Sequence, residues 1–230
     1  MLIDRVIAPY FETNCWILAL GTGQECIIVD PGMAKPNLVK EIEEKISDLN
    51  LKPVAVLITH GHLDHTFSVL PLTKQVPMRT FITGADRFLL TDPMGALDRG
   101  GVSEQFLKAF GMEKFKEPDE VVELEDFLTF EVAGMQITSI FAPGHTKGSV
   151  IFTVDDQQLI SGDVLFAGSI GRTDLPTGSA NEMRKTLRDR ILTLPDGLNV
   201  LPGHGGQTTI AIERVRNAYL QDEFLDQKGR

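Results

Sequence analysis

The sequence predicts an α+β protein in which two β-rich halves stack face to face, giving a four-layer α/β/β/α sandwich. Strand, helix, strand and helix patterns run in the same order through both halves of the chain, although no sequence repeat accompanies them. The length of 230 residues also suits one large domain with a substantial hydrophobic core. We therefore expect residues 1–230 to form a single domain.

The first half begins with two apolar, β-branched runs that predict a hairpin. These runs are Asn14–Leu20 and Gln24–Asp30, and the glycines of Gly21–Gly23 between them are typical of a turn. Pro36 then opens an expected helix. Its apolar residues recur at helical spacing and share one face: Leu38, Ile42, Ile46 and Leu49.

A continuous apolar run, Pro53–Thr59, predicts a central strand that is covered on both faces and leads directly into His60. An amphipathic segment follows near Phe67–Gln75. The stretch Gly84–Pro118 is helix-prone and contains several glycines, which suggest mobile joints. We expect it to be a helical, lid-like insert that interrupts the sandwich.

The second half repeats this order of elements. Gly134 and Asp155-Asp156 separate apolar runs and predict two further hairpins, and Ser179 with Glu182 matches a capping box at a helix start. Two hairpins, a helix, a strand and a closing helix are thus expected over Phe127–Ala142, Ser149–Ser161, Ser179–Leu194, Leu198–Leu201 and Thr209–Leu220.

Composition narrows the classes of partner. With 22 basic and 32 acidic residues, the net charge of −10 opposes binding to nucleic acid. Cys15 and Cys26 lie in apolar runs without metal or redox spacing, so we expect two reduced core residues. The chain shows neither a secretory leader nor a run near the ~20 apolar residues of a membrane span. We expect a cytoplasmic monomer or small homo-oligomer without a membrane partner.

All five histidines lie in loops that follow expected strands, where a sheet scaffold places its chemistry. Imidazole and carboxylate groups are the ligands of divalent zinc, iron or manganese. The motifs THGHLDH, APGHTKGS, SGD and LPGHGG contain the candidate ligands His60, His62, Asp64, His65, His145, Asp163 and His204.

The spacing of these residues indicates two adjacent metal positions. His60 and His62 straddle a glycine, so both rings can bind one ion, whereas Asp64 and His65 point to a neighbouring position. Asp163 carries two oxygens that can bridge two cations, and the remaining two histidines complete one ion each. Two ions about 3.5–4 Å apart would hold a hydroxide that is nucleophilic at neutral pH.

The same motifs, in this order, resemble the metallo-β-lactamase superfamily over essentially the whole chain. Within it, LFAGSIGRTDLPTGS is similar to the glyoxalase II, or hydroxyacylglutathione hydrolase, group. The resemblance implies two divalent ions, Zn²⁺ by preference and Fe or Mn as alternatives. It assigns His60, His62 and His145 to the first ion, Asp64, His65 and His204 to the second, and Asp163 to both.

This resemblance implies hydrolysis of an acyl-thiol ester such as S-D-lactoylglutathione. A metal-bridging hydroxide, positioned through Asp64 and Asp163, would attack the carbonyl carbon, and a thiolate with a pKa near ~8.5 would leave readily. Arg172, in the GRTD segment, is expected to bind a carboxylate of the thiol carrier. Asp174 stands where the family has an aromatic hydroxyl, and the chain ends without the family's C-terminal helical extension, so a carrier other than glutathione stays open.

Other activities remain alternatives. A persulfide dioxygenase with one iron shares the GRTD segment but leaves the second metal position empty, whereas a lactonase of the same fold uses the same seven ligands. A nuclease is disfavoured by the negative charge, and a secreted β-lactamase by Asp163, where the commonest such enzymes have cysteine. Metal content separates the dioxygenase from the hydrolase.

Overall fold

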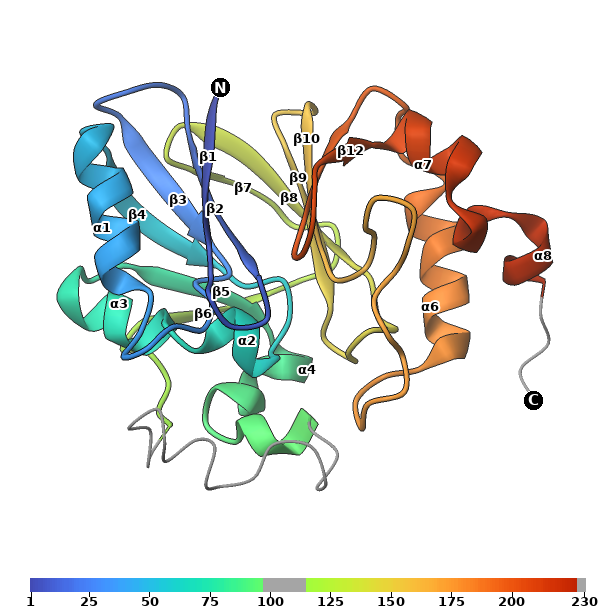
Figure 1. The fold of residues 1–230 in the computed structure, drawn as a ribbon, viewed down its shortest axis with the longest axis horizontal. Coiled ribbons are helices and arrows are strands. Elements are labelled where there is room, and N and C mark those ends of the chain that lie inside the picture. Colours follow the sequence, from blue (N-terminus) through green and yellow to red (C-terminus); the bar gives the residue numbers. More distant parts are fainter. Residues whose placement is uncertain (97–114, 227–230) are drawn as a thin grey trace.

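Two six-stranded sheets face each other at the centre of the molecule, and helices cover the outer face of each sheet (Figure 1). The computed structural model describes residues 1–96 and 115–226. Its layers run helix, sheet, sheet, helix, so the four-layer α/β/β/α sandwich predicted from the sequence is confirmed.

The first sheet has the strand order β1-β2-β3-β4-β5-β6. The pairs β1–β2 and β2–β3 are antiparallel, while β3, β4, β5 and β6 run parallel. The ends of β3 and β4 therefore meet at one edge of the sheet. The strands are β1 (Leu2–Ile7), β2 (Asn14–Ala19), β3 (Glu25–Val29), β4 (Lys52–Leu57), β5 (Arg79–Thr83) and β6 (Val121–Leu124).

The second sheet has the order β12-β11-β10-β9-β8-β7 and is antiparallel except for the pair β10–β11. Ala133 and Gly134 have positive φ angles, as a two-residue hairpin turn of type I′ requires, and Asp155 and Asp156 have positive φ angles in the three-residue loop between β9 and β10. The strands are β7 (Thr129–Val132), β8 (Met135–Phe141), β9 (Val150–Val154), β10 (Gln158–Gly162), β11 (Asn199–Pro202) and β12 (Thr208–Thr209).

The helices of the first half follow its strands closely. They are α1 (Val39–Asp48), α2 (Leu63–Thr66), α3 (Val69–Gln75), α4 (Gly84–Arg87), η1 (Phe88–Leu90) and η2 (Pro93–Ala96). In the second half, Ser179 caps α6 by accepting a hydrogen bond from the Glu182 backbone, as the capping box predicts. The helical segments there are α6 (Ala180–Thr186), the π-helical η3 (Leu187–Ile191), α7 (Ile210–Arg216), η4 (Ala218–Leu220) and α8 (Asp222–Leu225).

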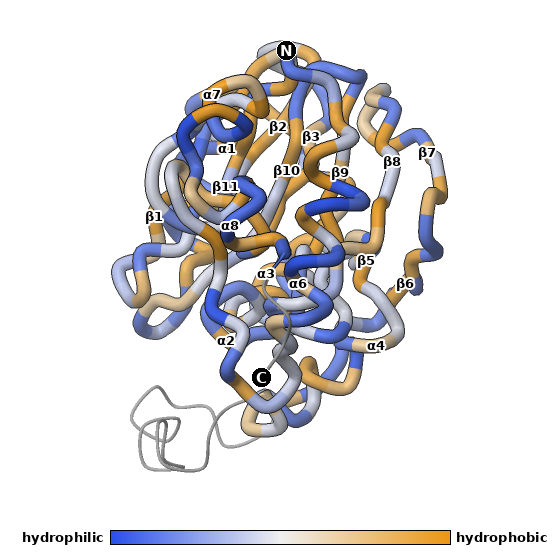
Figure 2. The backbone as a smooth tube through the Cα atoms, turned by 90° about the vertical axis from the view of Figure 1, so that its right-hand side faces the viewer, coloured by the Kyte–Doolittle hydropathy of each residue, from blue (hydrophilic) through white to orange (hydrophobic). Residues whose placement is uncertain are grey.

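Three layers of apolar side chains hold the sandwich together. Successive residues of a strand point to opposite faces, so Ile17 packs towards α1 while Leu18 packs between the sheets. Ile27 and Ile28 of β3 divide in the same way. A third cluster, which includes Met183, fills the space between the second sheet and its helices. The hydrophobic strands at the centre appear in orange in Figure 2.

Some boundaries differ from the sequence expectations. Strand β4 ends at Leu57, before Thr59, because the Thr59 backbone N–H donates to the Asp30 carboxylate. The expected closing helix is divided at Asn217, whose side chain bonds to Glu213 and to the Ser169 carbonyl. Strands β1, β5 and β6 were not anticipated, because their short, mixed polar and apolar segments lack a clear period.

The expected insert at Gly84–Pro118 is helical at its beginning, where α4, η1 and η2 lie. Leu89 of this segment packs closely on Gly61. A Cβ atom added at Gly61 would lie 2.6 Å from a methyl carbon of Leu89. Residues 97–114 lie outside the described residues, so the lid-like role of the insert stays a prediction. No helix within the described ranges is long and apolar enough to cross a membrane.

Candidate metal centre

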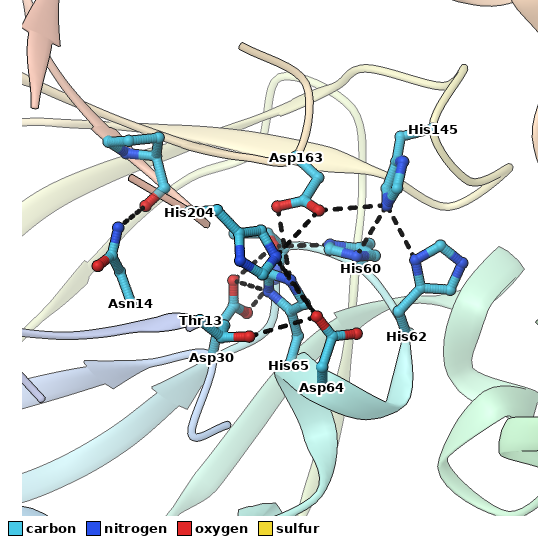
Figure 3. Close-up of polar contacts among 12 residues, drawn as sticks. Thr13, Asn14, Asp30, His60, His62, Asp64, His65, His145, Asp163 and His204 are labelled. Carbon is cyan, nitrogen blue, oxygen red and sulfur yellow. Dashed lines mark hydrogen bonds and ion pairs between the residues drawn. The ribbon is translucent and has the colours of Figure 1, made fainter. Parts of the chain in front are cut away.

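The seven candidate ligands converge on one edge of the two sheets, although they come from four segments of both halves (Figure 3). His60 and His62 follow β4, and the latter caps the start of α2, which contributes Asp64 and His65. The remaining three ligands lie beyond the ends of β8, β10 and β11: His145, Asp163 and His204. The expected convergence at strand ends is therefore present in the structure.

Three buried histidines form a first cluster. The Nδ1 atom of His62 lies 2.9 Å from Nε2 of His145, which in turn lies 3.2 Å from Nε2 of His60. These atoms all lie within 4.8 Å of one another. Three ring nitrogens thus face a common point, which is the arrangement of three ligands around one cation.

Two histidines and a carboxylate form a second cluster beside the first. Nε2 of His65 lies 3.2 Å from Nε2 of His204, and Oδ2 of Asp64 lies 3.5 and 3.4 Å from these two nitrogens. The rings of His60 and His65 have centroids only 4.1 Å apart, so the two clusters adjoin.

Asp163 lies between the clusters (Figure 3). Its Oδ2 atom is 3.5 Å from Nε2 of His145 in the first cluster and 3.4 Å from Nε2 of His204 in the second. Its Oδ1 atom is buried and accepts no hydrogen bond from the described residues. The nearest cationic group to it is Nε2 of His65, at 3.5 Å. A buried, ionised oxygen without a hydrogen bond is costly, so this carboxylate is suited to a cation.

The distances within the clusters fit a divalent metal. Four ligands at about 2.0–2.1 Å from zinc, arranged tetrahedrally, have donor atoms about 3.3 Å apart. The nitrogen–nitrogen separations here are 2.9–3.2 Å and the nitrogen–oxygen separations 3.4–3.5 Å. Ring nitrogens at such distances cannot all hydrogen-bond to one another, whereas a cation would satisfy them together. The His-rich site therefore indicates divalent metals, without distinguishing zinc from iron.

The two clusters differ in their protonation. Burial, together with the neighbouring histidines, lowers the pKa of His60 well below its usual value and that of His62 to about 3. Burial also disfavours a charged His204, but the carboxylates of Asp163 and Asp64 outweigh it and raise the pKa to about 9. His60 and His62 of the first cluster thus offer neutral imidazoles, whereas protons compensate the carboxylates of the second cluster in the absence of metal.

Two side chains behind the clusters fix which ring nitrogen faces inward. The Thr59 hydroxyl donates to Asp30 (2.6 Å), so it can accept from Nδ1–H of His60 at 3.1 Å. The same Asp30 oxygen lies 3.0 Å from Nδ1 of His65. Both histidines then present Nε2 as the free electron pair. From the sequence, Asp30 is only the last residue of an expected strand, with no role assigned to it.

Asp86, at the start of the insert, connects the loops of the first cluster. Its carboxylate accepts hydrogen bonds from the Gly61 backbone (2.8 Å), the Thr146 hydroxyl (2.6 Å) and the Gly148 backbone (2.8 Å). This single buried carboxylate therefore joins the His60–His62 loop to the His145 loop. Sequence reasoning missed Asp86, because a lone aspartate in a helix-prone segment has no distinctive pattern.

Close packing leaves no room for side chains at two glycines. A Cβ at Gly203 would lie 2.2 Å from Oδ1 of Asp163 and 2.7 Å from His65, and one at Gly171 would lie 2.0 Å from the Asp163 carbonyl oxygen. The PGHG and GRTD segments can therefore approach the carboxylate only because these positions are glycine.

Arg172 contacts the centre through its backbone. Its carbonyl oxygen accepts a hydrogen bond of 2.7 Å from Nδ1 of His145, which turns Nε2 of that ring towards the first cluster. The guanidinium group is largely exposed and makes two hydrogen bonds, of 2.8 and 2.7 Å, to Asp174. The structure thus places the expected substrate-binding side chain beside the centre, paired with its neighbour in the loop.

A sandwich of this kind, with two adjoining ligand clusters at its strand ends, defines the class of metal-dependent α/β/β/α hydrolases. The model of the metallo-β-lactamase superfamily matches residues 8–204, and the chain belongs to this superfamily.

Relatives extend the match over the whole chain. An uncharacterised protein of Mycobacterium tuberculosis is 39% identical over 228 residues, which cover 96% of this chain and 98% of the relative. A protein named hydroxyacylglutathione hydrolase GloC, from Haemophilus influenzae, is 32% identical over 226 residues, 97% of this chain and 100% of its own length.

Solved structures show the same fold. The BLEG-1 B3 metallo-β-lactamase is 28% identical with a TM-score of 0.80, and the match covers 95% of this chain and 99% of that one. TTHA1623, solved in a di-iron-bound form, is 29% identical with a TM-score of 0.75, and the match covers 94% and 99% of the two chains.

Proposed function

We propose that the chain hydrolyses an acyl-thiol ester, of the S-D-lactoylglutathione kind, at a dinuclear metal centre. The observation that carries this proposal is the pair of adjoining clusters that share Asp163. The full-length similarity to the relative named hydroxyacylglutathione hydrolase GloC supports the substrate class.

Each cluster would hold one divalent cation. His60, His62 and His145 would bind the first, Asp64, His65 and His204 the second, and Asp163 both. Two such ions supply a hydroxide nucleophile at neutral pH and polarise the carbonyl group that is attacked. Zn²⁺ suits this donor set, and iron is an equally concrete candidate because the similar TTHA1623 was solved in a di-iron-bound form.

The protein's own groups prepare this chemistry. The Arg172 carbonyl and the pair Thr59–Asp30 orient the rings of His145, His60 and His65 before any ligand arrives. Asp64 and Asp163 supply the negative charge that keeps two cations close together. The leaving thiolate, with a pKa of about 8.5 in its free form, departs without a general acid from the chain.

A mononuclear persulfide dioxygenase explains the site less well. Such an enzyme needs only the first cluster, whereas Asp64, His65 and His204 here form a second set of comparable closeness. A lactonase is compatible with the same seven residues, so substrate tests must separate it from the thiol ester hydrolase.

Arg172 is the proposed contact to a carboxylate of the thiol carrier. Its loop reaches the first cluster, because its carbonyl oxygen touches His145. On substrate binding, the guanidinium would release the Asp174 carboxylate and donate the same two hydrogen bonds to the substrate carboxylate. Either carboxylate is planar and can accept two hydrogen bonds from one guanidinium.

The direct test combines metal analysis with a substrate panel. Protein purified without chelator should contain close to two first-row metal ions per chain, and should hydrolyse acyl-thiol esters in preference to acyl-homoserine lactones and β-lactams. One iron per chain together with oxygen consumption on a persulfide would replace the proposal with the dioxygenase. Two ions with turnover of lactones alone would replace it with the lactonase.

A further inference from the structure

A groove opens beside the first cluster and is lined by residues from both halves of the chain. Ala85 and Phe88 form one side, and the other includes Pro143, Lys147, Pro176 and Glu182. We refer to it as the Lys147 groove.

Both sides of the Lys147 groove are tied to the metal ligands. Lys147 lies two residues after His145 in the same loop. On the other side, Asp86 lies between Ala85 and Phe88, and its carboxylate bonds to the Gly61 backbone and the Thr146 hydroxyl. A molecule in the groove therefore lies next to the first cluster, and the position of both walls relative to the ligands is fixed by Asp86.

The charges in the groove are few and opposite. Lys147 and Glu182 are the charged residues among those that line it, and both are exposed. Across residues 1–96 and 115–226, neither side chain takes part in a hydrogen bond or an ion pair. Arg172, by contrast, is already paired with Asp174. The rest of the lining is apolar or uncharged, and the Phe88 ring is 45% exposed.

We propose that the Lys147 groove binds a free α-amino-acid end of the thiol carrier. Lys147 binds its carboxylate, Glu182 binds its ammonium group, and Phe88 covers the aliphatic carbons between that end and the sulfur. This inference rests on the proposed thiol ester hydrolysis and deepens it, because it requires a carrier with both charges. A carrier whose amino group is acylated satisfies Lys147 but leaves Glu182 without a partner.

The test uses S-methylglutathione, a thioether that cannot be hydrolysed, with metal-loaded protein in a calorimeter. Lys147→Met should weaken its binding about tenfold, the loss expected for one charge-assisted hydrogen bond in a partly desolvated groove. Lys147→Arg should restore most of the affinity. Glu182→Gln should weaken binding of S-methylglutathione several-fold. The same substitution should leave the affinity for N-acetyl-S-methylglutathione, which lacks the ammonium group, unchanged.

Matched controls come from an exposed pair on α1. Lys40 and Glu44 are 81% and 64% exposed, far along the chain from the groove residues, and Lys40→Met and Glu44→Gln should leave binding unchanged. Because the ligand is not turned over, the measurement does not depend on the reaction assigned to the protein.

The outcomes separate the two proposals. If thiol esters are hydrolysed but Lys147→Met binds S-methylglutathione as the wild type does, the groove assignment is wrong while the function stands. If no thiol ester is hydrolysed but binding still depends on Lys147 and Glu182, the function is wrong and the groove assignment stands. Failure of the wild-type protein to bind the thioether at millimolar concentration overturns the groove assignment.

Discussion

The two candidate ligand clusters lie side by side, yet they differ in the charge and protonation of their side chains. The first consists of three buried histidines, and the lowered pKa values of two of them, His60 and His62, keep those two rings neutral. In the second, two histidines face two carboxylates, and the pKa of His204 is raised to about 9 by Asp163 and Asp64, in spite of its burial. The first cluster is thus ready for a cation at neutral pH, whereas a cation in the second must displace protons.

This difference has a thermodynamic consequence. A cation that displaces one proton loses about tenfold in affinity for each unit by which the pH falls below the pKa of the ligand. Affinity at the second cluster should therefore be more sensitive to pH around neutrality than affinity at the first. The experiments below test whether the clusters are distinct in this way, from the largest effect to the smallest.

The largest effect is expected at Asp163, which belongs to both clusters. Asp163→Ala removes the oxygen that lies close to His145 and His204, so metal content and turnover should fall together, turnover by at least about 10³-fold. Metal analysis and steady-state kinetics measure the two losses. Asp156→Asn, in an exposed hairpin turn, is the control. Wild-type activity in Asp163→Ala would show that this aspartate is not shared between two ions.

Asp64→Ala should separate the clusters. The substitution removes a carboxylate from the second cluster only, so the protein should retain about one ion per chain, bound by the three histidines of the first. Elemental analysis before and after dialysis gives the count. A content that is one ion in the wild type and unchanged in the variant would rule out the dinuclear centre.

Arg172→Ala tests the side chain without disturbing the first cluster, because the backbone carbonyl that orients His145 is retained. Loss of a carboxylate contact of roughly 1.5–3 kcal/mol corresponds to a rise in KM of about 10- to 150-fold for a carboxylate-bearing thiol ester. The value of kcat should change much less, and a small uncharged thiol ester should be nearly indifferent. Equal losses on both substrates would assign Arg172 to the structure of its loop instead.

The smallest effect is on the stability of the metal-free protein. His62, with its pKa lowered to about 3, takes up a proton on unfolding below pH 6.5, so stability should fall from pH 6.5 towards pH 4. His204, with its pKa raised to about 9, loses its favourable proton as pH rises, so stability should also fall from pH 6.5 towards pH 9.

Urea unfolding of chelator-treated protein across this range measures both limbs. His204→Gln should reduce the alkaline limb, of which a part remains because the pKa of His65 is also raised by its carboxylate neighbours, and should leave the acid limb in place. An alkaline limb that persists unchanged in this variant would contradict the charge difference between the clusters.

The candidate ligands could be found from the sequence because their pattern is local. Three histidines and an aspartate lie within six residues, His60 to His65, and the glycine-flanked His145 and His204 follow recognisable strands. The hairpins were equally predictable, since their turns need residues that tolerate positive φ, such as Gly134.

The supporting contacts could not be found in this way. Asp86 can position the candidate ligands only because α4 comes to lie against loops 25 and 60 residues away in sequence. The segments β5 and β6 are strands because they pair with parallel neighbours, and their own residue pattern does not predict a strand. Contacts that depend on tertiary packing leave no periodic trace in a single sequence.

The division of each cluster between the two halves bears on how the protein is assembled. The first cluster takes His60 and His62 from the first half and His145 from the second, while the second cluster is incomplete before His204. Neither half therefore contains a complete coordination set. A complete coordination set would therefore exist only after both sheets have formed and docked, in contrast to small zinc domains, in which one short segment supplies all the ligands.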